Sequence, residues 1–211
     1  MFKKNYFMEK NLPLQTKIRY RKMRLLIGNA DDKIILDIGA GRLPISKGIK
    51  TKRTLRLDGV KKYSPDICCD LDKGIPLKNN SVDIIIAGEI IEHIYNPIKF
   101  IKECNKVLKK GGFLILSTPN ICSLKNRFKI FVGQLPEYCA EPSEDESFER
   151  HIIDFNFPRL VQILKKNGFK IIKKTSNGII YHSQSIFPRF LTPPQFGETI
   201  IIKSKKVNNL K

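Results

Sequence analysis

The chain of 211 residues has no apolar run that approaches the length of a membrane span, because Lys, Arg or Asn interrupts every isoleucine-rich stretch. Its five cysteines include no C-x-x-C pair and form an odd set, which argues against a disulfide framework. The basic segment Met1–Lys10 is followed by neither an uninterrupted apolar segment nor a small-residue cleavage site, so no secretory signal is expected. We therefore expect a cytoplasmic protein with reduced thiols.

Acidic residues are scarce: 20 Asp and Glu stand against 39 Lys and Arg, which gives a formal net charge of +19. Such an excess is typical of proteins with a polyanionic partner, either nucleic acid or an anionic membrane surface. Compositional drift is the alternative, because Lys, Ile and Asn are all abundant and the basic residues are spread along the chain, as on a solvated surface. We favour drift, and both polyanionic partners stay open.

Apolar residues make up 41% of the chain and charged residues 28%, which indicates one globular domain of this length. Short apolar runs alternate with segments of helical periodicity, and this order predicts an α/β fold with a mostly parallel sheet. Strands are expected at 33–38, 54–58, 66–69, 81–87, 112–117, 169–172 and 199–202, with the last two in a hairpin-like arrangement. Residues 1–30 are expected to form a basic helical cap, helical around 14–26, before a main domain at 31–211.

Two further helices follow from capping signals. Asn96 and Pro97 suit a helix start, Lys109 and Lys110 suit its end, and Gly111 is expected to stop it. A second helix is expected to open at Pro158 and close at Asn167-Gly168.

A glycine turn, Gly39-Ala-Gly41, ends the first expected strand. In open α/β sheets ligands bind at such carboxyl ends, and small residues let the backbone approach a ligand closely. Asp37 lies inside the strand and could organise the turn, while Asp58 ends the next strand, where an acid binds ribose hydroxyls. A nicotinamide fingerprint would need glycine at Pro44 and has no acid at position 37, so the pattern favours S-adenosylmethionine over NAD.

Several segments in order carry a family resemblance. Ile35–Gly41 resembles the first motif of class I S-adenosylmethionine-dependent methyltransferases. The motifs that follow it in that family are similar to Cys69–Asp72 with Ile75–Leu77, Asn80–Ile85 with Glu89–Ile94, and Val107–Phe113 with Ser117–Asn120. His151 and the stretch Phe157–Phe169 resemble the late helix of the type 11/type 23 group. The family often has a third glycine two positions after Gly41, where this chain has Leu43.

The resemblance implies a Rossmann-like, doubly wound α/β sheet of seven strands, mostly parallel with the last strand antiparallel, and helices on both faces. It also implies a methyltransferase whose cofactor is S-adenosyl-L-methionine. Matching positions would surround the methionine part (Asp37, Gly39, Ala40, Gly41), meet the ribose (Asp58, with Gly59 beside it) and the adenine (Asp70, Leu71), or lie near the sulfonium end (Glu89, His93).

His93 and His151 are the catalytic candidates, because an oxygen acceptor gains from a general base and histidine titrates near neutral pH. A structural histidine is the alternative for His93, and a loop-anchoring hydrogen bond is the favoured alternative for His151. Methyl transfer can proceed by positioning and desolvation, so no metal is expected.

Residues 121–150 interrupt the alternation of strands and helices and are expected to form an insert or lid over the acceptor site. Its first half has the periodicity of an amphipathic helix and carries Lys125, Arg127 and Lys129, so contact with a membrane surface is an alternative. Lid packing is favoured.

Three functions remain open on the sequence. The leading one is methyl transfer to a small-molecule, saccharide or lipid-intermediate acceptor. RNA methylation is less favoured, because no RNA-binding module is present and no aromatic residues interleave with the basic clusters. A non-catalytic regulatory protein that binds S-adenosylmethionine is the third. The sequence does not predict the oligomeric state.

Overall fold

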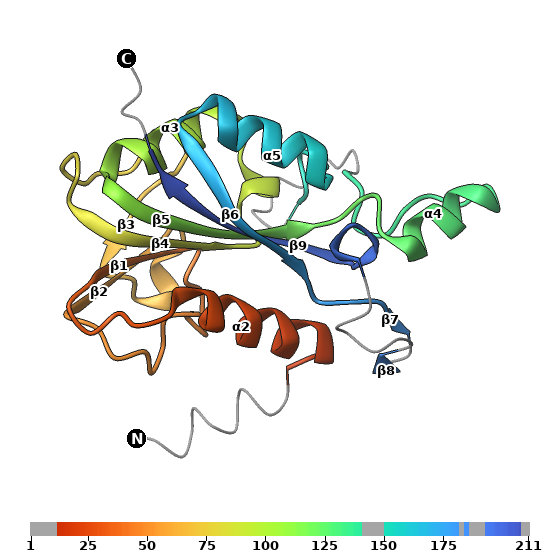
Figure 1. Cartoon of the computed structure of the whole chain (residues 1–211), viewed down its shortest axis with the longest axis horizontal. Helices are drawn as coiled ribbons and strands as arrows, with labels where there is room; N and C mark the ends of the chain where they lie inside the picture. The colour runs from red at the N-terminus through yellow and green to blue at the C-terminus, as the bar shows by residue number, and fades with distance from the viewer. Residues whose placement is uncertain (1–11, 141–149, 182–183, 186–192, 208–211) are drawn as a thin grey trace.

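A computed structural model describes residues 12–140, 150–181, 184–185 and 193–207 (Figure 1). A seven-stranded sheet in the order β3-β2-β1-β4-β5-β9-β6 forms its centre. β9 is antiparallel to both of its neighbours, and every other pairing in this sheet is parallel, as predicted. The strands are β1 (Ile34–Ile38), β2 (Arg53–Asp58), β3 (Ile67–Cys68), β4 (Val82–Gly88), β5 (Leu108–Pro119), β6 (Phe169–Ser176) and β9 (Thr199–Lys206).

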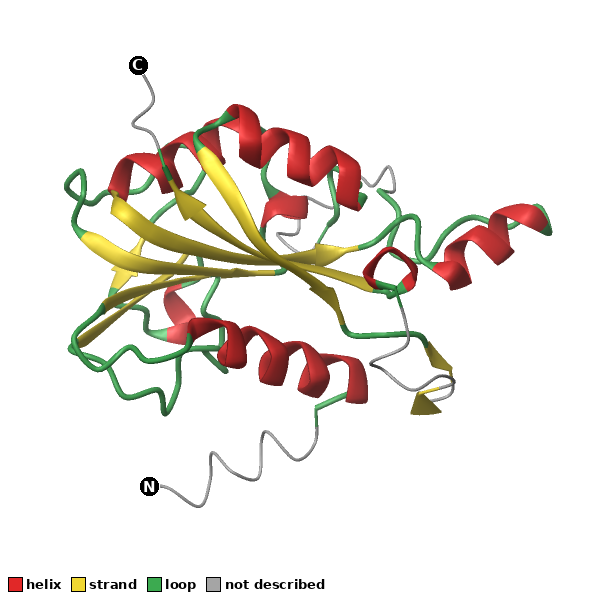
Figure 2. Cartoon of the chain, in the orientation of Figure 1, coloured by secondary structure: helices red, strands yellow, loops and turns green. Residues whose placement is uncertain are grey.

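Helices cover both faces of the sheet (Figure 2). α2 (Leu14–Ile27) lies on one face, whereas α3 (Pro97–Val107) and α5 (Phe157–Lys166) lie on the other. Each strand contributes side chains to both faces of the sheet, because successive side chains point to opposite sides. In β1, for example, Ile35 packs in the cluster around α2, and Leu36 packs in the cluster with α3 and α5. The doubly wound fold predicted from the sequence is confirmed.

The predicted N-terminal helix is also present, and it is part of the core. Met23 is fully buried, and Ile27 packs beside it against the sheet. The division between a cap at 1–30 and a domain at 31–211 stays a prediction, and residues 1–11 of that cap lie outside the described residues.

The predicted end of α3 is wrong. The Asn96 side chain caps the helix start as expected, accepting a hydrogen bond from the Lys99 amide (2.9 Å). The helix ends at Val107, however, and β5 begins directly at Leu108. Lys109 reaches the Asp83 carboxylate of β4 (2.9 Å), so it belongs to the sheet ladder and not to the helix end. Gly111 therefore lies inside the strand.

Smaller elements complete the described chain. Three 3₁₀ turns, a short helix and a two-stranded hairpin were not placed, or not placed fully, by the sequence: η1 (Lys61–Tyr63), η2 (Ile91–His93), η3 (Pro194–Phe196), α4 (Leu124–Phe131), β7 (Ile180–Tyr181) and β8 (Gln184–Ser185). All five cysteines are free thiols. Among the described residues, no helix has both the length and the apolar character that a membrane crossing requires.

The central strand β4 offers a test of the packing. Ile86 is fully buried, so we expect Ile86→Ala to lower the free energy of unfolding by about 2–5 kcal/mol through lost contacts and a residual cavity. Ile98 on α3 is 48% exposed, and Ile98→Ala should change it by less than about 0.5 kcal/mol. Urea unfolding of both variants checks this; equal losses would contradict the assignment of the core.

Candidate active site

A cavity of about 650 Å³ lies at the carboxyl edge of β1, β2 and β4. This is the edge where the strand order reverses, with β2 and β4 on opposite sides of β1. Its volume lies in the range of small-molecule sites. It brings together most of the residues predicted from the sequence: Gly39, Gly41, Asp58, Gly59, Asp70, Leu71, Glu89, His93 and His151.

The glycine turn forms one wall of this cavity. Gly39 and Gly41 both have positive φ angles, of 67° and 51°, which side chains rarely adopt. A Cβ on Gly39 would also approach the side chain of Ile90 to 3.1 Å. The turn is fixed to the neighbouring strand by a hydrogen bond from the Gly39 amide to the Leu57 carbonyl (2.9 Å).

Asp58 connects the two loops that border the cavity. One carboxylate oxygen accepts from the Gly41 amide and the other from the Val60 amide, each at 2.8 Å. A carboxylate has about four acceptor positions, so capacity remains for a ligand hydroxyl. The role predicted for Asp58, accepting from a ribose, stays a prediction supported by this position.

Asp37 and Ala40 do not line the cavity. Asp37 is 1% exposed and accepts a hydrogen bond from the Ser46 amide (2.8 Å), so its carboxylate organises the loop from behind. Burial raises the pKa of Asp37, and the hydrogen bond from Ser46 opposes that rise. Ala40 is buried as well. Both residues support the loop, and the structure places neither against the cavity.

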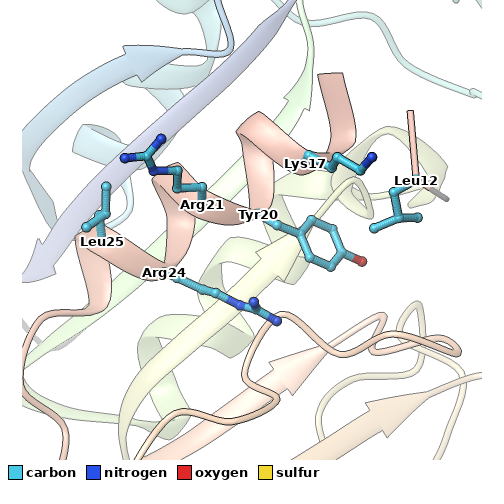
Figure 3. A pocket seen from close by; sticks show the side chains of 6 residues that line it. All are labelled: Leu12, Lys17, Tyr20, Arg21, Arg24 and Leu25. Carbon is cyan, nitrogen blue, oxygen red and sulfur yellow. The ribbon is translucent and has the colours of Figure 1, made fainter. Parts of the chain in front are cut away.

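A separate cavity of about 410 Å³ lies along α2 and shows how this helix holds the same loop (Figure 3). Tyr20 donates to the Leu43 carbonyl (2.8 Å), and Arg24 donates to the Ile45 carbonyl (2.9 Å). Figure 3 shows both side chains projecting from the same side of the helix. The loop after β1 therefore needs no following α-helix to fix it: turns fill residues 45–48.

Glu89 follows β4 and is held by two partners. Its carboxylate pairs with Arg19 of α2 (2.7 Å) and accepts from the Ser117 hydroxyl (2.9 Å). The residue has a positive φ of 53°, which points to a constrained turn at the cavity edge. Charge neutralisation by Arg19 was not predictable from the sequence, because α2 is far from Glu89 along the chain.

A second, smaller cavity of about 180 Å³ adjoins the first and shares Glu89, His93 and His151 with it. Its other walls come from segments that are distant in the sequence. They include the ends of β5 and β9 and the start of α2, with lining residues Gln15, Thr16, Glu92, Pro119, Tyr138, Asn177, Glu198 and Thr199. None of these eight was predicted as a site residue.

His93 and His151 lie side by side, with ring centroids 4.9 Å apart. The Nδ1 atom of His93 is 2.8 Å from the Arg150 carbonyl, and the Nδ1 atom of His151 is 2.8 Å from the Tyr138 carbonyl. Since a carbonyl can only accept, Nδ1 carries the proton in both contacts. In a neutral ring this leaves the lone pair on Nε2, the atom that can act as a base or a ligand.

Glu92 is the one acidic residue of η2 among the site residues that sequence reasoning missed. It is 2% exposed; Thr118 donates to its Oε2 atom (2.9 Å), and its buried Oε1 atom has no hydrogen-bond partner. Burial raises the pKa of the Glu92 carboxyl to about 7, although the Thr118 hydrogen bond and the charges of His151 and Arg19 oppose the rise. The only sequence signal was its position between Glu89 and His93 in one short motif.

Residues 36–116 match the family model described as a methyltransferase domain. A probable S-adenosylmethionine-dependent methyltransferase of Mycolicibacterium smegmatis is 28% identical over 98 residues, 46% of this chain and 32% of that protein. A ubiquinone biosynthesis O-methyltransferase of Pelagibacter ubique is 29% identical over 140 residues, 65% of this chain and 52% of that protein. The chain thus spans about a third of the length of the first relative and about half of the second.

Solved structures show the same fold. A putative S-adenosylmethionine-dependent methyltransferase from Listeria monocytogenes superposes with a TM-score of 0.64 at 14% identity, covering 92% of this chain and 100% of that one. Residues 36–116 thus match a methyltransferase domain, and the chain has the fold of class I S-adenosylmethionine-dependent methyltransferases. S-adenosylmethionine is the cofactor that this family implies.

Substitution of Asp58, whose carboxylate bridges the two loops, tests cofactor binding. We expect Asp58→Asn to weaken binding of S-adenosylhomocysteine by roughly 10- to 100-fold, because one charge-assisted contact of about 1.5–3 kcal/mol is lost. Isothermal titration calorimetry measures the change. Asp66→Asn is the matched control, because Asp66 pairs with Arg56 outside the cavity. An unchanged Kd in a folded Asp58→Asn protein would remove Asp58 from the site.

Proposed function

We propose that the chain transfers a methyl group from S-adenosylmethionine to an oxygen atom of a lipid intermediate. The observation that carries methyl transfer is the pair of adjoining cavities that share Glu89, His93 and His151. The larger cavity suits the cofactor, and the smaller one suits the acceptor. The shared residues then lie where the methyl group passes between the two.

His151 is the proposed general base, with His93 beside it as the second candidate. The Tyr138 carbonyl holds the Nδ1 proton of His151, so Nε2 can take the proton of an acceptor hydroxyl. Positioning the acceptor in line with the S–CH₃ bond supplies the rest of the catalysis and needs no covalent intermediate. The relatedness to ubiquinone biosynthesis O-methyltransferases agrees with an oxygen acceptor.

The α4 apolar surface supports a lipid acceptor; it consists of Phe128, Ile130, Phe131, Val132 and Leu135. All five side chains are exposed, Phe131 to 85% and Leu135 to 75%. Figure 1 shows α4 extending away from the sheet. The lid expected over the acceptor site stays a prediction. Exposed apolar groups of this size mark a contact surface.

Hydrogen bonds and ion pairs anchor α4 to the segment that follows it, so the helix can project from the fold with its apolar side chains exposed. Asn126 is buried and exchanges hydrogen bonds with the backbone of Glu137, whose carboxylate also pairs with Lys125 and Lys129. The next residue, Tyr138, lines the smaller cavity and contacts His151. A membrane seated on α4 would therefore lie close to the proposed acceptor site, and the chain's net charge of +19 favours an anionic surface.

The activity is tested by incubating the protein with S-adenosylmethionine and lipid extracts and measuring S-adenosylhomocysteine release. We expect His151→Ala to lower turnover by roughly 100- to 10,000-fold while cofactor binding is retained, since a general base contributes that much. Turnover only with added RNA would support the nucleic-acid alternative instead. Cofactor binding without turnover on any acceptor would support a regulatory protein.

Membrane contact has its own test, in sedimentation with vesicles that contain phosphatidylglycerol. Replacing one aromatic anchor, in Phe131→Ser, should weaken vesicle binding by roughly 10- to 100-fold, because burying such a side chain contributes about 1.5–3 kcal/mol. Leu25→Ser on α2, at 71% exposure, is the control and should bind as the parent protein does. Equal binding of both variants would exclude α4 as the membrane-facing element.

A further inference from the structure

Three side chains at the junction of the two cavities carry the donor atoms of a metal site. Glu92 and His93 come from η2, and His151 comes from the segment before α5. One potential ligand atom from each lies within 4.8 Å of the other two. We propose that Glu92, His93 and His151 bind a divalent transition-metal ion, which goes beyond the metal-free methyl transfer expected from the sequence.

The two histidines are oriented as metal ligands are. A ligating histidine almost always donates its other ring N–H to a carbonyl or carboxylate, which fixes the ring and its tautomer. Both rings here show that arrangement at Nδ1, with the Arg150 and Tyr138 carbonyls at 2.8 Å. Because a backbone carbonyl occupies Nδ1 in each ring, Nε2 is the atom of each histidine that would bind the metal.

Glu92 supplies a negative charge and a carboxylate oxygen that has no hydrogen-bond partner. A cation would satisfy that oxygen. The Oε1 atom of Glu92 is buried and has no hydrogen-bond partner, whereas Thr118 fixes Oε2. Leaving such an atom unpaired destabilises the folded protein, and more so when the atom is charged. The nearby Arg19 does not replace a metal, because its guanidinium pairs with Glu89 at 2.7 Å.

The backbone holds the cluster together across a long sequence separation. The amides of Ile152 and Ile153 both donate to the Glu92 carbonyl, at 2.8 and 3.2 Å. His151 is therefore tied directly beside η2. Ligands about 2.0–2.2 Å from one metal ion lie roughly 3–3.5 Å apart, so the side chains need to close by about 1 Å or somewhat more. Rotation about side-chain bonds supplies that movement.

Two histidines and one carboxylate suit Zn²⁺, Fe²⁺ or Mn²⁺, and they leave coordination positions open. All three side chains line the smaller cavity, and His93 and His151 also line the larger one, so the open positions would face the bound acceptor. There the ion would bind the acceptor hydroxyl oxygen and lower its pKa. The hydroxyl proton passes to solvent, the oxygen forms a bond to the methyl carbon, and the S–C bond breaks with its electron pair left on sulfur. With the ion bound, Nε2 of His151 is a metal ligand, and the ion activates the hydroxyl in place of the general base. This catalytic role rests on the proposed function, but metal binding does not.

Metal binding is tested on the full chain after treatment with a chelator, by calorimetry with Zn²⁺ and by the visible absorption spectrum with Co²⁺. We expect one equivalent to bind with a d–d spectrum, and His151→Ala and Glu92→Gln each to weaken binding at least roughly tenfold. Cys68→Ser is the control, because its exposed thiol could bind Zn²⁺ adventitiously. It should bind as the parent does.

Circular dichroism and S-adenosylhomocysteine binding establish that each variant is folded. Metal affinity that is absent in the parent, equal in His151→Ala, or lost in Cys68→Ser would overturn the site. These outcomes are separate from the proposed function. A chelated protein that binds S-adenosylhomocysteine normally but loses turnover, restored by Mn²⁺ or Zn²⁺, would support the catalytic role of the ion.

Discussion

The carboxylate of Asp58 is the contact on which the larger cavity depends. It accepts from the Gly41 amide on the first loop and from the Val60 amide on the second, so both loops share one acceptor group. This bridge is possible because β1 and β2 run parallel in register, with Ile38 beside Leu57, and both end at the same edge. Without the bridge, two backbone N–H groups would lose their acceptor and the wall between the loops would open.

The sheet was predictable because its strands are short apolar runs separated by clear turn signals. All seven strands of the main sheet were placed, since burial on both faces requires β-branched and apolar residues at successive positions, as in β4. The end of α3 was not, because Lys109 and Lys110 beside glycine suit a helix end equally well. Residues from Leu108 onward form a strand because Leu108 pairs with Val82 of β4. That contact is not local, so the sequence does not reveal it.

The residues of the larger cavity could be predicted from local motifs, whereas the rest of the candidate site could not. Gly39, Asp58 and Asp70 were found because each ends or follows a strand, and parallel strands deliver such positions to one edge. Glu92 gave no comparable signal. Its importance arises from burial and from His151, which backbone hydrogen bonds bring beside it from a distant segment. The sequence also could not reveal that α2 would supply the countercharge for Glu89.

The two cavities draw on different parts of the polypeptide. Apart from His151, every side chain around the larger one falls between positions 36 and 116, the span shared with the family model. The smaller one takes Gln15, Thr16, Tyr138, Asn177 and Thr199 from outside that span. In the proposed function, selectivity for the methylated compound can therefore diverge through α2, Tyr138 and the start of the final strand, while the residues of the proposed donor cavity stay unchanged. A protein that aligns only across residues 36–116 shares the segment that lines most of the larger cavity and lacks a counterpart for the residues that complete the smaller one.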